Sequence, residues 1–463
     1  MRELVRQNRW FFIVFALLGV GLRLFYVYWF PHYAGDSILY ADIAQNWLHK
    51  GTYALTENDV AVATLIRLPG YPAFLALLFK ILGANAEHML PVLLVQAFID
   101  LAGCFVIAAL TLELFSEKAS KCAFALAALC PFTANYVSLP LTETLAIFFA
   151  GLALLFAAKA IRRLDAGELS LGLWAACGLA LGAGILLRPD GGILLAALLL
   201  FLAYRLVTSA HRKRILVASL IVATLALAPL VPWTIRNWQA FHIFQPLAPR
   251  YASAPDEYVP LGFNRWIKTW LVEYVSVEDI FWNVSTETPG ETIHAESLPD
   301  RAFDSPQERD QVTALFAEFN QTLILTRETD AKFAQLARER IAHAPLRYYV
   351  ELPAMRIADM WLRPRTEMLP VDQRWWTFDD PPESWFAVGY GALNLMFVLA
   401  GVIGLVRFRG AHIYGLLLGF ILLRSVFLST MENPEPRYTL ECFPVILAMG
   451  AAVAARENPP QKH

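Results

Sequence analysis

The stretch WFFIVFALLGVGLRLFYVYWF, from Trp10 to Phe30, decides the fold class. It is an apolar run long enough to cross a bilayer as a helix, for which about 20 residues suffice. Similar runs recur along the 463 residues, of which 57% are hydrophobic and only 17% charged, whereas soluble domains carry roughly 25% charged residues. The sequence therefore predicts an all-α polytopic membrane protein. No small-residue cleavage site follows this first run, so we expect a retained anchor helix.

The apolar runs and the basic residues between them predict the topology. We expect about ten transmembrane helices. They cover residues 10–30, 88–115, 122–139, 143–161, 171–187, 191–207, 215–234, 386–406, 411–430 and 438–455. Arginines and lysines gather in alternate loops, and the positive-inside rule places these loops and both termini in the cytoplasm. The short segment 68–82 would reverse this pattern if it crossed, so it is expected as a juxtamembrane helix at the outer surface.

This topology divides the chain into three parts. Residues 1–236 form an N-terminal transmembrane module whose first outer loop is 31–87, residues 237–385 form one large outer segment that is partly helical, and residues 386–463 form the C-terminal transmembrane helices. In the outer segment Trp266 and Trp270 lie four residues apart on a predicted helix, where they either line an acceptor cleft or pack in a core. The five cysteines all lie in apolar segments, so neither a disulfide framework nor a metal knuckle is predicted.

Ionisable residues at the outer ends of the spans are the candidate functional residues. The acids are Asp36 and Glu143, and the arginines are Arg67, Arg188, Arg236 and Arg437. A charge at the rim of a helical bundle is costly and marks a functional site by default. Simpler explanations exist for each residue alone, because an interfacial arginine can extend to lipid phosphate, and Asp190 can simply favour a helix N-terminus. The gathering of several arginines and two acids at one depth favours a site.

This set of charges suits the transfer of a sugar from a lipid phosphate. Guanidinium groups stabilise the charge that develops on the departing phosphate, and a carboxylate takes the proton of the acceptor hydroxyl. Asp36 is the candidate base, and the four arginines are candidate ligands of the donor phosphate. A transporter or flippase of a lipid-linked saccharide is the alternative, although paired halves and charges near the bilayer midplane are typical of transporters. An inactive scaffold of a cell-envelope assembly is a third interpretation.

Six motifs in order resemble a known family. They are GDSILYADIAQNWLHKGTY (35–53), IRLPGYPAFLALL (66–78), YVSLPLTETLAIFFAGLALL (136–155), LGAGILLRPDGGILL (181–195), PWTIRNWQAFHIFQPLA (232–248) and NPEPRYTLECFPVILA (433–448). From about residue 10 to residue 455 the chain resembles the bacterial GT-C glycosyltransferases of the protein mannosyltransferase and lipid A aminoarabinose transferase type. The resemblance implies inverting transfer of a sugar from a polyprenyl-phosphate-linked donor to a lipid, glycan or protein acceptor. It places the reaction on the periplasmic face of the bacterial inner membrane.

The resemblance also carries site residues over to this chain. It implies that Asp36 is the catalytic aspartate, that Glu143 is a second acid and that Arg67 is a basic residue of the site, with Arg236 and Arg437 on recurring RN and RY positions. Many relatives have an acidic pair in the first outer loop, whereas this chain has Asp36 followed by serine. A divalent cation such as Mg or Mn would therefore need both Asp36 and Glu143, because hard cations prefer oxygen ligands.

Overall fold

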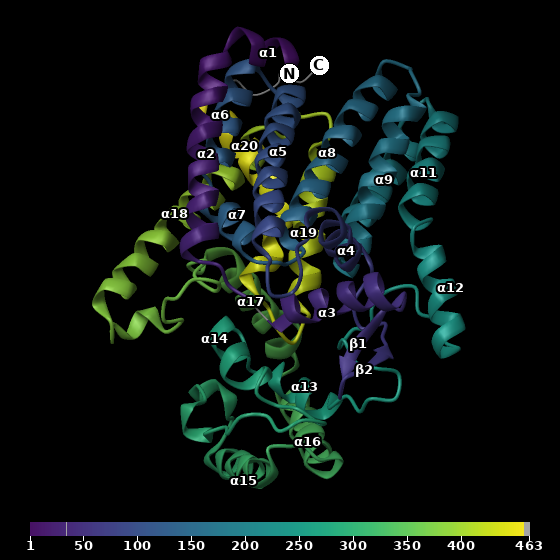
Figure 1. The fold of residues 1–463 in the computed structure, drawn as a ribbon. Helices are drawn as coiled ribbons and strands as arrows, with labels where there is room; N and C mark the ends of the chain where they lie inside the picture. The colour runs from purple at the N-terminus through teal and green to yellow at the C-terminus, as the bar shows by residue number, and fades with distance from the viewer. Residues whose placement is uncertain (34, 458–463) are drawn as a thin grey trace. The chain divides into compact units, whose positions relative to one another are not determined.

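The structure is a computed structural model that describes residues 1–33 and 35–457. The chain forms two compact units (Figure 1). Unit 1 comprises Met1–Ala254, Ala392–Arg424 and Leu440–His463, and unit 2 comprises Pro255–Gly391 and Ser425–Thr439. Unit 2 thus begins later than the predicted outer segment 237–385, and it includes a second, separate piece of chain.

Unit 1 is built from helices and one short hairpin. Before residue 255 its elements are α1 (Arg2–Gln7), α2 (Arg9–Trp29), α3 (Gly35–Lys50), β1 (Ala54–Glu57), β2 (Val60–Ala63), α4 (Gly70–Leu82), α5 (Leu90–Leu114), α6 (Glu117–Ala128), α7 (Pro131–Asn135), η1 (Tyr136–Ser138), α8 (Glu143–Asp165), α9 (Leu171–Leu187), η2 (Pro189–Gly191), α10 (Gly192–Thr208), α11 (Arg212–Leu227) and α12 (Leu230–Phe241). The later helical elements are α18 (Pro381–Arg407), α19 (Tyr414–Ser429), η8 (Pro436–Cys442) and α20 (Phe443–Ala454), of which α18, α19 and η8 each cross a boundary between the units.

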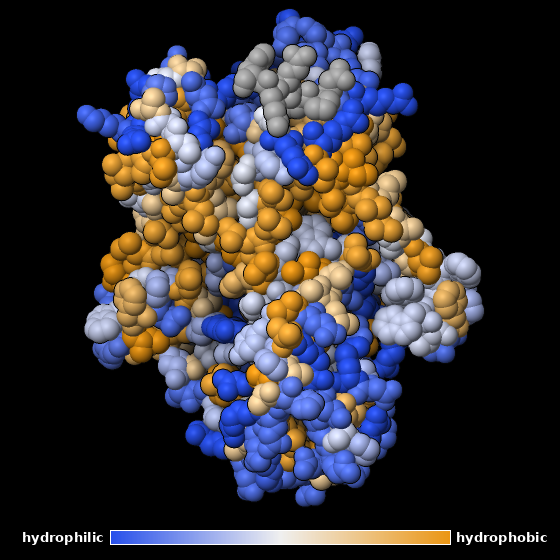
Figure 2. Space-filling view, turned by 180° about the vertical axis from the view of Figure 1, so that it is seen from behind, coloured by the Kyte–Doolittle hydropathy of each residue, from blue (hydrophilic) through white to orange (hydrophobic). Residues whose placement is uncertain are grey.

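Long apolar helices confirm that the protein is a multi-pass membrane protein. Within the described residues, seven helical stretches are long and apolar enough to cross a bilayer, and α4, α9 and α19 are shorter apolar helices. Hydrophobic side chains cover the long helices on the face seen in Figure 2. Such a surface suits lipid rather than water, because a soluble protein rarely exposes apolar patches of this extent. All but one of the predicted spans coincide with an apolar helix, and segment 68–82 forms helix α4 as expected.

The exception is the predicted span 122–139, which is not one helix. The chain forms α6, breaks at Cys130, and continues as α7 and η1. The break lies before Pro131, because a residue that precedes proline is sterically kept out of the helical region. Cys130 is accordingly extended, with φ −69° and ψ 110°. Apolar composition predicted one continuous span here and missed the proline break.

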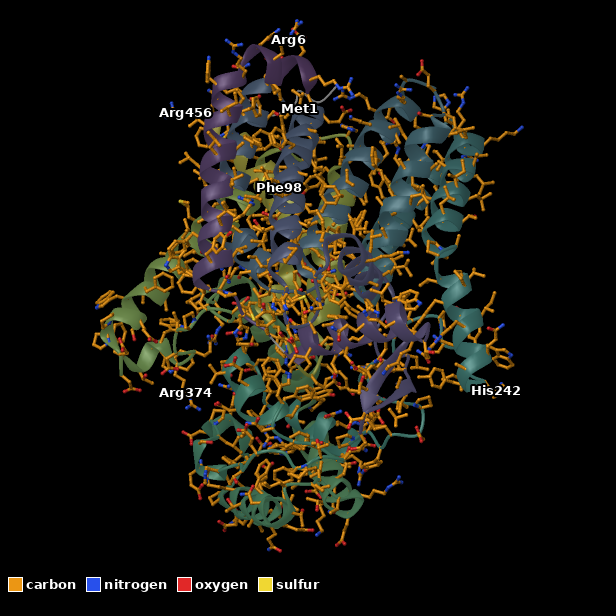
Figure 3. The ribbon with its side chains drawn as sticks, in the orientation of Figure 1. Met1, Arg6, Phe98, His242, Arg374 and Arg456 are labelled. Atoms are coloured by element: carbon orange, nitrogen blue, oxygen red, sulfur yellow. The ribbon has the colours of Figure 1, made fainter. Side chains whose placement is uncertain are left out.

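The basic loops lie together at one end of unit 1. Lys121 donates a 3.1 Å hydrogen bond to Asn8, and Arg162 forms a 2.8 Å ion pair with Glu113. Figure 3 shows Arg6 and Arg456 at this same end, beside Met1. The helices α2 and α8 each join this end to the opposite one, where Asp36 follows α2 and Glu143 begins α8. The candidate site residues of unit 1 therefore lie at the end away from the basic loops.

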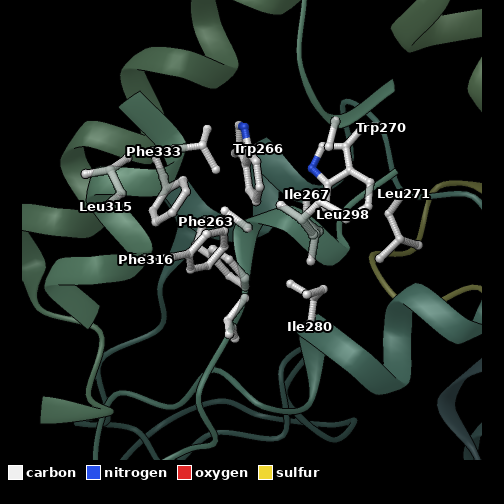
Figure 4. Close-up of a cluster of buried hydrophobic side chains, with 14 of the residues drawn as sticks. Phe263, Trp266, Ile267, Trp270, Leu271, Ile280, Leu298, Leu315, Phe316 and Phe333 are labelled. Atoms are coloured by element: carbon white, nitrogen blue, oxygen red, sulfur yellow. The ribbon is translucent and has the colours of Figure 1, made fainter. Parts of the chain in front are cut away.

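Unit 2 is a small helical unit with an aromatic core. Its elements are α13 (Leu261–Ile267), α14 (Tyr274–Ser276), η3 (Val277–Phe281), η4 (Ala295–Ser297), η5 (Asp300–Ala302), α15 (Pro306–Thr322), α16 (Arg327–His343), η6 (Arg347–Glu351), α17 (Leu352–Leu362) and η7 (Trp375–Thr377). Trp266 and Trp270 are fully buried in this core, where Phe316 and Phe333 pack against Trp266 (Figure 4). Of the two interpretations open for these tryptophans, the structure supports packing.

Candidate active site

Asp36 lies in the first turn of α3, after the loop that follows α2. Its Oδ1 atom is 2.6 Å from a terminal nitrogen of Arg67, which lies in the loop between β2 and α4. The Asp36 side chain is 31% exposed and that of Arg67 is 19% exposed, so a polar substrate can reach both groups. A carboxylate in the first turn of a helix is also favoured by the helix dipole. The structure thus brings together the two residues predicted from the first outer loop.

A short hairpin holds the backbone of Arg67 in place. Strands β1 and β2 pair antiparallel, and their connecting residues Asn58 and Asp59 have positive φ angles, as tight two-residue hairpin turns require. The hydroxyl group of Tyr53 donates a 2.9 Å hydrogen bond to the carbonyl oxygen of Arg67. Tyr53 itself is buried. The position of the Arg67 guanidinium therefore depends on the hairpin and not only on its own loop.

Arg236 supports the same hairpin from α12. Its guanidinium donates 2.6 Å hydrogen bonds to the carbonyl oxygens of Tyr53 and Thr64. It also lies over the rings of Tyr53, Trp233 and Phe241, 5.2–5.3 Å from the ring centroids, at distances where a cation attracts an aromatic face. The structure thus places this predicted phosphate ligand on backbone carbonyls, and it links Arg236 to Arg67 through Tyr53.

We expect the substitution Arg236→Gln to act on stability. It removes two charge-assisted hydrogen bonds, so the free energy of unfolding should fall by about 1–3 kcal/mol. Thermal unfolding in detergent, compared with the exposed control Gln239→Ala on the same helix, measures this loss. A variant of unchanged stability that only raises the KM for the lipid donor would instead identify Arg236 as a phosphate ligand.

Glu143 and Arg188 form part of a buried group of charges. Glu143 is the first residue of α8 and is 4% exposed, and Arg188 follows the last residue of α9. A terminal nitrogen of Arg188 donates a 2.9 Å hydrogen bond to Glu143 Oε1, and its Nε donates a 3.0 Å bond to Asp190 Oδ1. Pro189 ends α9 at this point, because the residue before proline is held extended, here at φ −147° and ψ 134°. Asp190 is thus an ion-pair partner and not only an acid at a helix start.

Two further residues complete this group, and sequence reasoning missed both. Arg424 on α19 is 1% exposed and donates hydrogen bonds of 2.8 Å to Asp190 Oδ2 and 2.9 Å to Glu441 Oε1. Glu441 also lies 3.5 Å from Arg188. The signal was an arginine within the apolar run LLLGFILLRSVFLS, where an ionisable residue is a functional candidate by default. We call Glu143, Arg188, Asp190, Arg424 and Glu441 the charge network.

Tyr40 connects the Asp36–Arg67 pair to the charge network. It lies one turn beyond Asp36 on α3 and is buried. Burial, together with the negative charges of Asp36 and Glu143, raises the pKa of Tyr40 to about 12. The positive charges of Arg67 and Arg188 oppose this rise. Both charge pairs therefore act on one phenol, which stays protonated at neutral pH.

Gly70 brings the Arg67 loop against the end of α9. A Cβ atom at Gly70 would lie 2.6 Å from the carbonyl oxygen of Leu186 and 3.0 Å from the backbone nitrogen of Leu187. Neither atom can yield as a flexible side chain can, so only glycine fits here. Because Arg67 lies three residues before Gly70 and Arg188 directly follows Leu187, this backbone contact draws the two arginine-bearing segments together.

Arg437, the remaining predicted phosphate ligand, belongs to unit 2. Its Nε lies 2.5 Å from Glu435 Oε2, and its guanidinium lies over the ring of Tyr438. Arg437 is 8% exposed and Glu435 is fully buried. Within unit 2 it is thus paired with an acid, as Arg67 and Arg188 are within unit 1.

The acids of unit 1 do not form a metal site in this arrangement. Among the residues that the structure describes, no three His, Cys, Asp or Glu side chains are grouped so that they could hold an ion. Asp36 is paired with Arg67, and Glu143 is paired with Arg188. A divalent cation would have to displace a guanidinium from each carboxylate, so this set of side chains does not fit one. No step of the proposed reaction uses a metal.

In unit 2, Asp359 on α17 predicts a pH-dependent stability. Burial raises its pKa from the usual 3.8 to about 6, although the positive charge of Arg363 opposes the rise. The folded state therefore binds a proton more tightly than the unfolded state, so stability falls as the pH rises from about 4 to about 6. We expect Asp359→Asn to stabilise the protein at pH 7 by up to about 3 kcal/mol and to leave it unchanged at pH 4. Unfolding measured at both pH values tests this, and equal stabilisation at both would contradict it.

Comparison with known proteins gives a family model that matches part of the chain, and it gives the fold. The family model described as dolichyl-phosphate-mannose-protein mannosyltransferase matches residues 67–235, which include Arg67, Glu143 and Arg188. The structure of the oligosaccharyltransferase AglB from Archaeoglobus fulgidus with an inhibitory peptide and a dolichol-phosphate has a TM-score of 0.53 at 14% identity, covering 96% of this chain and 50% of that one. The same enzyme tethered to an acceptor peptide gives a TM-score of 0.52 at 14% identity, covering 96% and 49%. The chain has the GT-C fold.

The fold is the one that the sequence resemblance implied. The chain spans about half the length of the oligosaccharyltransferase that it matches. ArnT from Cupriavidus metallidurans in the apo state gives a TM-score of 0.42 at 15% identity, covering 95% of this chain and 77% of that one. A comparison with curated protein sequences gives no match.

Proposed function

We propose that this GT-C chain transfers a sugar from a polyprenyl-phosphate-linked donor to a hydroxyl or phosphate of a cell-envelope acceptor, with inversion. The observation that carries the proposal is the contact between Asp36 and Arg67, a partly exposed carboxylate beside a partly exposed guanidinium. A transferase of this kind needs both groups within reach of one substrate. The AglB structure that contains dolichol-phosphate supports a lipid-phosphate donor for this fold.

In this proposal Asp36 is the general base. It accepts the proton of the acceptor hydroxyl while the hydroxyl oxygen forms a bond to the anomeric carbon of the sugar. The bond from that carbon to the lipid phosphate breaks on the opposite face, and its electron pair leaves with the phosphate. Attack opposite to the leaving group inverts the anomeric centre. Asp36 ends the step protonated, and the lipid phosphate carries one more negative charge.

Arg67 is the ligand of the leaving phosphate in this proposal. A guanidinium can bind two phosphate oxygens at once, and it stabilises the charge that develops as the bond breaks. Arg188 contributes positive charge near the same place, but its hydrogen bonds already go to Glu143 and Asp190. We therefore assign Glu143 and Arg188 to the support of the site rather than to direct proton transfer. Arg236 positions Arg67 through the hairpin, and Arg437 stays a candidate for the phosphate.

The proposed location follows from the positions of the charges. The basic loops lie at one end of unit 1, and positively charged loops stay in the cytoplasm. The site would then face the periplasm of a bacterial inner membrane, with both termini in the cytoplasm. Asp36, Arg67 and Glu143 at the opposite end of the bundle support this orientation.

Reconstitution of the purified protein tests the proposal. Proteoliposomes receive a polyprenyl-phosphate donor with a radiolabelled sugar and an extract of cell-envelope lipids and glycans. We expect label in a new glycosidic product, with release of one polyprenyl phosphate for each sugar transferred. Movement of the labelled lipid across the bilayer without a new glycosidic bond would establish the transporter instead.

A further inference from the structure

The phenol of Tyr40 is a buried polar group to which the proposed reaction gives no task. Tyr40 is 8% exposed and lies one turn beyond Asp36 on α3. Its hydroxyl forms no hydrogen bond with any residue that the structure describes. Buried hydroxyls normally have a partner, because burying one without a hydrogen bond costs free energy. This hydroxyl is therefore suited to a ligand that is not part of the chain.

Neighbouring side chains hold the ring of Tyr40 in one place. The rings of Tyr40 and Tyr71 meet edge to face, with centroids 5.1 Å apart, an arrangement that aromatic pairs favour. Tyr71 is fully buried, and its hydroxyl donates a 2.6 Å hydrogen bond to Oε1 of Gln96 on α5. The amide nitrogen of Gln96 donates a 2.8 Å bond to the carbonyl oxygen of Leu139, four residues before Glu143. Tyr40 thus rests on a side chain that is itself fixed on both sides.

Two ion pairs of the candidate site surround this phenol. The charges of Asp36 and Arg67 act on Tyr40, and so do those of Glu143 and Arg188. Each acid is paired with the arginine beside it, so these four residues add no net charge around the phenol. Burial raises the pKa of Tyr40 to about 12, so the hydroxyl keeps its proton at neutral pH. Tyr40 is therefore a neutral hydrogen-bond donor next to the proposed phosphate ligand.

We propose that the hydroxyl of Tyr40 donates a hydrogen bond to a phosphate oxygen of the lipid-linked donor, beside Arg67. A phosphate has several oxygens that accept hydrogen bonds, so one guanidinium does not occupy all of them, and bonds to a charged acceptor are the stronger ones. A neutral phenol also adds a donor without adding a cation that would compete for the Asp36 carboxylate. The inference rests on the proposed function, because the phosphate is that of the proposed donor.

Binding of polyprenyl phosphate without a sugar tests the inference apart from transfer. Isothermal titration calorimetry on the purified full chain in detergent gives the affinity for this lipid and for polyprenol, which lacks the phosphate. Tyr40→Phe should bind polyprenyl phosphate about tenfold more weakly, as expected for a lost hydrogen bond to a charged group, and should bind polyprenol as the wild type does. The matched control is Tyr28→Phe on α2, where the side chain is exposed, and it should leave both affinities unchanged.

Thermal unfolding separates a ligand contact from a structural one. Tyr40→Phe should unfold at the wild-type temperature, because the hydroxyl that it lacks bonds to no residue that the structure describes. Tyr71→Phe should unfold at a lower temperature, because it leaves Gln96 Oε1 without its donor. An equal loss of stability in both variants would show that the Tyr40 hydroxyl is bonded within the protein, and this would overturn the inference.

Three binding results would also overturn it. Equal affinity of the wild type and Tyr40→Phe for polyprenyl phosphate would remove the hydroxyl from the phosphate, while the proposed function would stand if transfer is observed. Weaker binding of the complete donor alone would assign the hydroxyl to the sugar. A wild type that does not bind polyprenyl phosphate would contradict both this inference and the proposed function.

Discussion

Asp36→Asn is expected to abolish measurable sugar transfer while leaving the protein folded. Asparagine keeps the shape of the side chain and can still accept a hydrogen bond from Arg67, so the pair seen at 2.6 Å can persist. What is lost is the ability to take a proton, which contributes about 10²–10⁴-fold to the rate of a reaction that needs a general base. The kcat should therefore fall by this factor, with little change in the KM for the lipid donor.

The control for this experiment is Glu57→Gln, an acid-to-amide change at an exposed position of the neighbouring hairpin. It removes the same charge from the same outer loop without touching Arg67, so transfer should continue at the wild-type rate. Steady-state kinetics in proteoliposomes and thermal unfolding in detergent are measured on all three proteins. Undiminished transfer by Asp36→Asn would exclude Asp36 as the base.

Arg424→Met is expected to have the largest effect on stability. Methionine has a similar length, so the change removes charge more than volume. It leaves Asp190 and Glu441 buried without the cation that bonds to both of them. Breaking a buried ion pair by removing one partner costs about 3–5 kcal/mol. Sugar transfer should fall as well, because Asp190 and Glu441 also contact Arg188.

A second substitution separates charge from packing in this experiment. Adding Glu441→Gln to Arg424→Met removes one of the uncompensated acids, so the double variant should recover part of the lost free energy of unfolding. Leu422→Met, at an exposed position of the same helix, is the control for the introduced side chain. If Arg424→Met were as stable as this control, the charge network would contribute nothing to the fold.

The sequence predicted those features that depend on local composition. Apolar runs alone identify a membrane protein, and alternate basic loops indicate which ends of the helices lie together. Asp36 and Arg67 were both candidates because they lie at the ends of one outer loop, and the structure adds the contact between them. The interpretation of 122–139 as a single span was wrong, because Pro131 keeps the preceding residue out of the helical region and so ends the helix, although the residues around it are apolar.

The charge network could not be predicted in the same way. Arg424 and Asp190 lie far apart in the sequence, so their contact depends on how α19 meets η2, which no local pattern encodes. The contacts of Arg236 could not be predicted either. Its position at a helix end suggested a ligand, whereas the structure gives it two backbone carbonyls and three aromatic rings.

Gly70, which has no side chain, limits how far the segments that carry Arg67 and Arg188 can move relative to each other. Here the segments that carry Arg67 and Arg188 meet main chain to main chain, at a joint without a side chain that could rotate. The spacing between the two arginine-bearing segments is therefore set by the backbone contact at Gly70 and not by a rotamer.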